Sequence, residues 1–157
     1  MGKLSHKLVP GNVYAIPIDR GYGFLQYVGK GMSDIEVARV LAPTAAELGE
    51  FTPQMCLQKE RYYIRMVVRA AERRGLLKFV GNYPLPPDAA LPTQYRHLEY
   101  VPHRNIRDWY VVDVATWKYR LVRKPDVDFF KLSCAGIWNI ALLRERLEQN
   151  WSLEEWK

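Results

Sequence analysis

The sequence predicts an α+β fold: a strongly bent, mostly antiparallel β-sheet, arranged as a meander or partial barrel, with a C-terminal α-helix packed on it. Two observations lead to this prediction. At least six short runs are rich in β-branched and aromatic residues, whereas a single segment near the end has strong helical periodicity. With 157 residues, the chain has the usual length of one domain, so we expect a single domain over residues 1–157.

The first predicted element is a β-hairpin in the stretch VYAIPIDRGYGFLQYVG. Residues 13–18 and 24–28 form two apolar runs of strand type. Between them, Asp19 can start a tight turn, and Gly21 and Gly23 can adopt the positive φ angles that such a turn uses. A phosphate-binding loop would need a further glycine or a Gly-Lys-Ser/Thr ending before a helix. The residues after Gly23 are instead aromatic and of strand type, so the stretch predicts a hairpin rather than a nucleotide site.

The next segments predict three more short elements. Apolar residues alternate with charged ones in SDIEVARVLAP, which predicts a third strand ending at Pro43, and residues 43–60 are expected to form a loop. In the segment 61–81, arginines recur every fourth residue, as on one side of a helix, while apolar and basic residues also alternate, as in a strand. Its β-branched and aromatic density favours a strand through Val68, then a short helical turn closed by Gly75, then another strand in LLKFVG.

The second half of the chain combines a connection, a hairpin and a helix. Five prolines lie between residues 82 and 105, which predicts an ordered surface connection and excludes a central strand. Strands are expected at Trp109–Val114 and Trp117–Val122. AGIWNIALLRERLEQNW is the best helix, and Ser133 could cap it. We expect the core to include Val13, Ile16, Phe24, Ile64, Met66, Val112, Trp138 and Leu147.

Composition and termini suggest a cytoplasmic protein. The formal net charge is +6, from 23 basic and 17 acidic residues, which suits an acidic protein partner, nucleic acid or simple solubility. The N-terminus lacks the apolar core of a signal peptide, and no apolar run approaches the roughly 20 residues of a membrane span. We therefore expect no membrane partner. Cys56 and Cys134 are expected to be buried thiols rather than a disulfide.

No set of residues in the sequence predicts catalysis, a metal site or a cofactor. His97 and His103 lie in a proline-rich segment without zinc-ligand spacing, and His6 stands alone. Cys134 follows Ser133 before the terminal helix and could in principle be activated there, but a packed thiol explains it equally well. Asp126 and Asp128 have no evident third metal ligand. We therefore expect a protein that is not an enzyme.

A basic and aromatic stretch at residues 59–78 suggests a binding surface. Arg61, Arg65 and Arg69 project to one side in either a strand or a helix, and we expect them at the surface. Arginine and aromatic residues are enriched at interface hot spots, so we predict that these arginines bind a partner together with Trp109 and Tyr110. Single-stranded nucleic acid is the alternative ligand, and arginines that only keep the sheet soluble are the simpler explanation.

Three segments occur in a characteristic order: GNVYAIPIDRGYGF, FVGNYPLPPD and GIWNIALLRERLEQNW, spread over residues 11–151. Their order resembles that of the immunity protein 26 family, which accompanies bacterial polymorphic toxins. The resemblance implies a small α+β protein that binds and neutralises a cognate toxin acting in the cytoplasm, such as a nuclease or a nucleotide-degrading enzyme. It supplies no catalytic motif and no contact residues. The positive net charge departs from the acidic character usual for inhibitors of basic nucleases.

Overall fold

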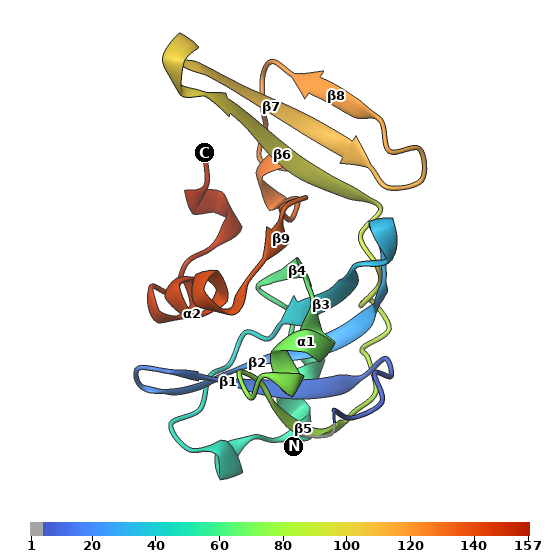
Figure 1. The fold of residues 1–157 in the computed structure, drawn as a ribbon, viewed down its shortest axis with the longest axis vertical. Helices are drawn as coiled ribbons and strands as arrows, with labels where there is room; N and C mark the ends of the chain where they lie inside the picture. Colours follow the sequence, from blue (N-terminus) through green and yellow to red (C-terminus); the bar gives the residue numbers. More distant parts are fainter. Residues whose placement is uncertain (1–4) are drawn as a thin grey trace.

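The computed structural model describes residues 5–157, which form two β-sheets and two α-helices (Figure 1). The first sheet has the strand order β5-β1-β2-β3-β4-β9, and the second has the order β6-β7-β8. The strands are β1 Asn12–Ile18, β2 Gly21–Lys30, β3 Glu36–Val40, β4 Tyr62–Met66, β5 Lys78–Asn82, β6 Gln94–Val101, β7 Ile106–Asp113, β8 Tyr119–Val122 and β9 Ile137–Trp138. The helices are α1 Val68–Arg73 and α2 Ile140–Glu148.

Every pairing in both sheets is antiparallel except that of β4 with β9. This arrangement confirms the α+β fold with a C-terminal helix on a mostly antiparallel sheet. The sequence did not predict that β6, β7 and β8 form a sheet of their own. In Figure 1 this second sheet stands across one end of the molecule, with the C-terminus beside it.

The first sheet is buried on both faces. Tyr14, Ile16 and Leu25 pack with Leu143 and Leu147 of α2 in the largest cluster of buried side chains. On the opposite face, the alternate residues of β1 and β2 pack against the segment that includes Leu41 and Cys56. The predicted core is confirmed, because all eight of its residues are buried: Val13, Ile16, Phe24, Ile64, Met66, Val112, Trp138 and Leu147.

The two glycines of the first hairpin have different roles. Gly21 has φ +129° and lies directly under the Ala45 backbone, with which Tyr22 exchanges two hydrogen bonds of 2.7 and 2.9 Å. Gly23 does not have a positive φ, contrary to the sequence prediction. It lies in β2, and a Cβ there would stand 2.6 Å from Cδ1 of Leu147. Gly23 therefore lets α2 approach the sheet closely.

Two sequence predictions about the second half are wrong. Residues 94–101 form the strand β6 rather than a connection, because the prolines lie outside this stretch and leave its amides free to pair with β7; β6 is an edge strand, so the exclusion of a central strand holds. Ile137 and Trp138 form a short strand beside β4 rather than helix, and α2 begins only at Ile140. Its cap is Asn139, whose side chain accepts a hydrogen bond from the Leu142 amide at 2.8 Å.

The remaining elements are short 3₁₀ turns at Met32–Asp34, Leu48–Glu50, Pro53–Leu57, Pro102–Arg104, Phe129–Lys131 and Leu153–Glu155. Three of them lie in segments that the sequence predicts to be loops or connections. Within the part of the chain that the structure describes, no helix is long and apolar enough to cross a membrane.

Candidate interaction surface

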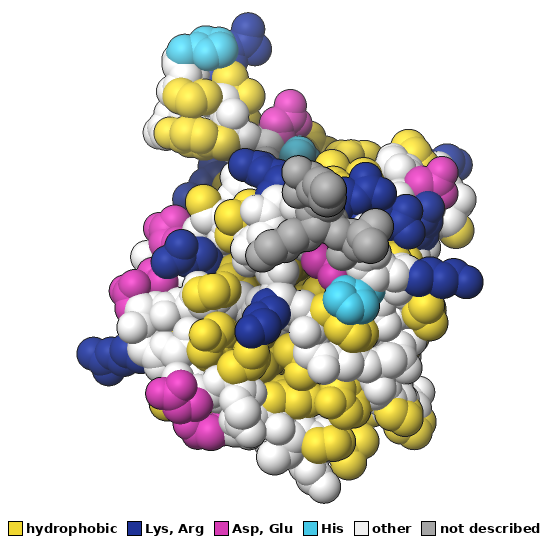
Figure 2. Space-filling model, turned by 60° about the horizontal axis from the view of Figure 1, so that its bottom comes forward, with side chains coloured by type: hydrophobic (Ala, Val, Ile, Leu, Met, Phe, Trp, Pro, Cys, Tyr) yellow, Lys and Arg dark blue, Asp and Glu magenta, His cyan; other side chains and the backbone are white. Residues whose placement is uncertain are grey.

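Arg61, Arg65 and Arg69 do not form a common surface. Arg65 is only 7% exposed and donates hydrogen bonds to the backbone carbonyls of Met32 and Ala135, so its predicted surface position is wrong. Arg61 is half-buried, and its guanidinium donates two hydrogen bonds to the Ala42 carbonyl. These hydrogen bonds hold the Arg61 side chain within the fold. Arg69 is exposed. Figure 2 shows one face of the molecule, on which basic side chains lie singly or in small groups among apolar ones.

Buried arginines are a structural feature that the sequence did not predict. Arg39 and Arg96 are fully buried, and Arg65 is nearly so. Arg39 donates to the side chain of Gln26 and to the carbonyls of Cys56 and Gln58. The main partners of these arginines are backbone carbonyls rather than carboxylates. They hold loop segments against the sheets, because each guanidinium carries several donors in a fixed plane.

Trp109 is part of an aromatic cluster around Arg96 and is not available to a partner. The residue is 8% exposed, and its ring centroid lies 4.8 Å from that of Trp156 and 5.6 Å from that of Phe129. The Arg96 guanidinium lies 4.7 Å from the Trp156 ring centroid and donates to the Leu153 and Trp156 carbonyls. The cluster fastens the C-terminal segment to the inner face of the second sheet.

Tyr110 points to the opposite face of the second sheet, because neighbouring residues of a strand alternate in direction. There it forms an aromatic group with His97 of β6 and Tyr119 of β8, with ring centroids 5.5 to 6.4 Å apart. Leu121 is paired with Tyr110 in the register and is exposed. Partial burial, with the nearby carboxylates of Glu99 and Asp108, raises the pKa of Tyr110.

We call the face formed by His97, Tyr110, Tyr119 and Leu121, with the adjoining Ile106, the outer face of the second sheet. Among residues 5–157, the exposed tyrosine and tryptophan side chains are Tyr100, Trp117 and Tyr119, each more than half exposed, and all belong to this sheet or its turns. Six exposed basic residues accompany three carboxylates over residues 94–124. The basic residues are Arg104, Arg107, Lys118, Arg120, Arg123 and Lys124.

The chemically reactive side chains found in the sequence have structural partners. Ser133 does not cap the helix, since its hydroxyl accepts a hydrogen bond from the Tyr63 amide at 3.0 Å. Asp126 accepts from the Phe129 amide, and Asp128 lies 3.6 Å from Lys131. Over residues 5–157, no group of three or more histidine, cysteine or acidic side chains is arranged to hold a metal ion.

Both cysteines are free and buried, as expected. Desolvation raises the pKa of Cys56, and it raises the pKa of the Cys134 thiol to about 12 despite the nearby cations Arg96 and Arg146. A thiol with such a pKa is protonated at neutral pH and lacks the thiolate that a nucleophile requires.

The Cys134 thiol should make the protein less stable in alkali. An unfolded cysteine ionises with a pKa of about 8.5, so the unfolded chain loses this proton first and the folded chain holds more protons between the two pKa values. We expect the wild type to lose free energy of unfolding relative to a Cys134→Ala variant as the pH rises above about 9. Urea unfolding of both proteins between about pH 7.5 and 10.5 checks this, and a constant difference would contradict the assigned burial.

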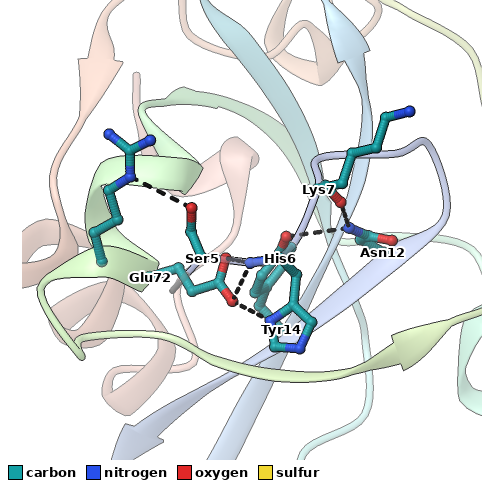
Figure 3. A network of polar contacts seen from close by, with 7 residues as sticks. Ser5, His6, Lys7, Asn12, Tyr14 and Glu72 are labelled. Carbon is teal, nitrogen blue, oxygen red and sulfur yellow. Dashed lines mark hydrogen bonds and ion pairs between the residues drawn. The ribbon is translucent and has the colours of Figure 1, made fainter. Parts of the chain in front are cut away.

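A polar network that the sequence did not predict joins the start of the described chain to α1 (Figure 3). The carboxylate of Glu72, which is buried, lies 2.5 Å from Nδ1 of His6 and accepts from the His6 amide. The His6 ring stacks on Phe79 at 3.8 Å. Beside it, the Asn12 amide donates to the Tyr14 hydroxyl. The network fixes the segment before β1 against α1.

The chain matches no protein-family model, no curated protein and no solved structure. The resemblance to the immunity protein 26 family is therefore neither supported nor opposed by these comparisons. The outer face of the second sheet is the candidate site that the structure itself provides.

Proposed function

We propose that this protein is an immunity-type inhibitor that binds a cognate bacterial toxin and neutralises it by protein–protein contact, without a catalytic step. One observation carries the proposal: the exposed tyrosine and tryptophan side chains of residues 5–157 all belong to the second sheet or its turns, and Tyr119 lies on the outer face beside Tyr110 and His97. A protein exposes such groups together chiefly where it binds something. We place this action in the cytoplasm, as the resemblance implies.

The chemistry of the outer face supports a protein partner. Tyrosine and tryptophan supply large contact areas with few rotatable bonds, and they are enriched at interface hot spots. The excess of basic over acidic side chains in residues 94–124 would steer a partner with an acidic surface toward the second sheet. Of the five residues that the sequence predicts to bind, Tyr110 lies on this face. Internal contacts engage the guanidinium groups of Arg61 and Arg65 and the ring of Trp109. We therefore propose Tyr119 and Leu121 as contact residues instead of these three.

Single-stranded nucleic acid is the second candidate ligand, because the same sheet carries stackable aromatics with basic neighbours. His97, Tyr110 and Tyr119 lie across three strands, and the exposed Lys118 and Arg120 belong to the same sheet or the turn before β8. Such surfaces bind phosphates through cations and bases through stacking. Binding of this kind would weaken steeply with added salt and would extend to unrelated oligonucleotides.

A growth assay tests the proposed function. The proteins encoded by the genes next to that of this chain are each expressed in a sensitive bacterium, with and without the chain, to find one that is toxic. We expect the chain to restore growth, and the purified pair to form a complex that survives about 0.3 M salt, because an apolar interface is less screened than phosphate binding. Continued killing in the presence of the folded chain would contradict the proposal. Salt-sensitive binding to unrelated oligonucleotides would favour the second candidate.

A further inference from the structure

A groove opens where β6 separates from the segment that leads into β9. The Arg96 amide donates to the Ser133 carbonyl and the Ala135 amide donates to the Arg96 carbonyl, each at 2.9 Å, so the two segments run parallel at this point. Beyond it, β6 stays with β7 and β9 stays with β4 (Figure 1). A cavity of about 320 Å³ lies between them. Its lining includes Leu98, Ile137, Leu142, Arg146, Trp151 and Trp156.

The backbone of β6 is unpaired along this groove. In an antiparallel pair, successive residues direct their amide and carbonyl groups alternately to either side. Arg96 directs its backbone amide and carbonyl groups away from β7. The backbone groups of Leu98 and Tyr100, two and four residues further along, therefore also point away from β7. Within residues 5–157, neither Leu98 nor Tyr100 has a hydrogen bond on that side. An unpaired strand edge is a template for an added strand.

The side chains that line the groove indicate which kind of ligand it can bind. Trp151 and Trp156 are partly exposed, and Ile137 is 55% exposed although it belongs to a strand. Arg146 lies over the Trp151 ring at 5.0 Å and forms no ion pair within the described chain. No acidic side chain lines the cavity. Apolar walls beside an unpaired arginine complement an apolar segment that carries carboxylates.

We infer that this groove binds an extended acidic and apolar segment of a partner protein, which adds as a strand to β6 at Leu98 and places apolar side chains against Ile137 and Trp156. Its carboxylate pairs with Arg146. This site lies at the β6 edge and shares only His97 with the outer face, so the inference goes beyond the proposed function and does not depend on it.

Titration of the full chain with acetyl-Glu-Leu-Val-Leu-Glu-amide tests this inference by tryptophan fluorescence and calorimetry. We expect saturable binding below about 1 mM, which corresponds to a modest affinity. The Arg146→Glu variant should bind at least about tenfold more weakly, because a carboxylate then faces the peptide's charge. The matched control is Arg144→Glu, which makes the same charge change on α2 outside the groove and should shift the affinity less than about twofold.

Two further peptides test the mode of binding. A lysine analogue should not bind, because its charge matches that of Arg146. A peptide methylated at the central amide nitrogen should bind less tightly, because it loses a strand hydrogen bond. The inference is overturned if the acidic peptide fails to saturate, if the lysine analogue binds equally, or if Arg144→Glu and Arg146→Glu weaken binding alike. Any of these results would leave the toxin assay unaffected, so the two proposals fail independently.

Discussion

Replacing Arg96 with methionine is expected to lower the free energy of unfolding by about 3–5 kcal/mol. Methionine has a similar length but no donors, so the carbonyls of Leu153 and Trp156 lose their hydrogen bonds, the first of them in the buried interior. The substitution also removes the guanidinium from the faces of Trp109 and Trp156. Because these contacts attach the C-terminal segment to the second sheet, their loss should separate the two.

Urea unfolding measures this effect, with Arg120→Met as the matched control. Arg120 belongs to the same sheet and is exposed, so its replacement should change stability by no more than about 0.5 kcal/mol. The Arg96→Lys variant should also be less stable than the wild type, because a single ammonium group does not reproduce the planar guanidinium. Equal stability of the Arg96→Met and Arg120→Met variants would show that Arg96 does not fasten the C-terminal segment.

Gly21→Ala is expected to destabilise the protein by about 2–4 kcal/mol, a large effect for one methyl group. The residue has φ +129°, which side chains rarely adopt, and an added Cβ would overlap the Ala45 carbonyl oxygen. The segment around Ala45 would have to move, which would break both of its hydrogen bonds with Tyr22. The hairpin would then lose its attachment to the covering loop.

The control for this prediction is Gly49→Ala. A Cβ at Gly49 would meet no atom within 4 Å, and its backbone is not in the positive-φ region. Thermal unfolding of both variants should therefore show a large fall in the melting temperature for Gly21→Ala alone. A Gly21→Ala protein as stable as the Gly49 variant would contradict the described turn.

The first half of the fold could be predicted because its local signals agree. Turn formers separate strands with β-branched and aromatic residues, so β1, β2 and β3 can be inferred from pattern alone. The separate second sheet could not be predicted in this way. β6 lies in a proline-rich segment, and only its pairing with β7 over eight register positions makes it a strand. Long-range pairing of this kind leaves little trace in local sequence.

The candidate site was harder to predict than the fold. Arg65 looks like a surface residue in sequence, but its guanidinium is buried and donates hydrogen bonds to carbonyls of distant segments such as Ala135. Tyr119 is the opposite case, since its aromatic type suggests burial and the structure exposes it. Sequence alternation marks two faces of a strand without saying which face is covered. The packing of Trp109 identifies the inner face of the second sheet. The opposite face is buried at Tyr95 and Val112 and exposed at Tyr119 and Leu121.

The most direct measurement of the central claim is the affinity of the purified chain for the toxin protein identified by the growth assay. We compare the wild type, a Tyr119→Glu and Leu121→Glu double variant, and a Leu57→Glu control, in which an exposed apolar residue outside the second sheet is changed. If the outer face binds the toxin, the double variant should lose at least about 100-fold in affinity while its melting temperature and the control's affinity stay near wild type. A folded double variant that binds as tightly as the wild type would contradict the assignment of this face.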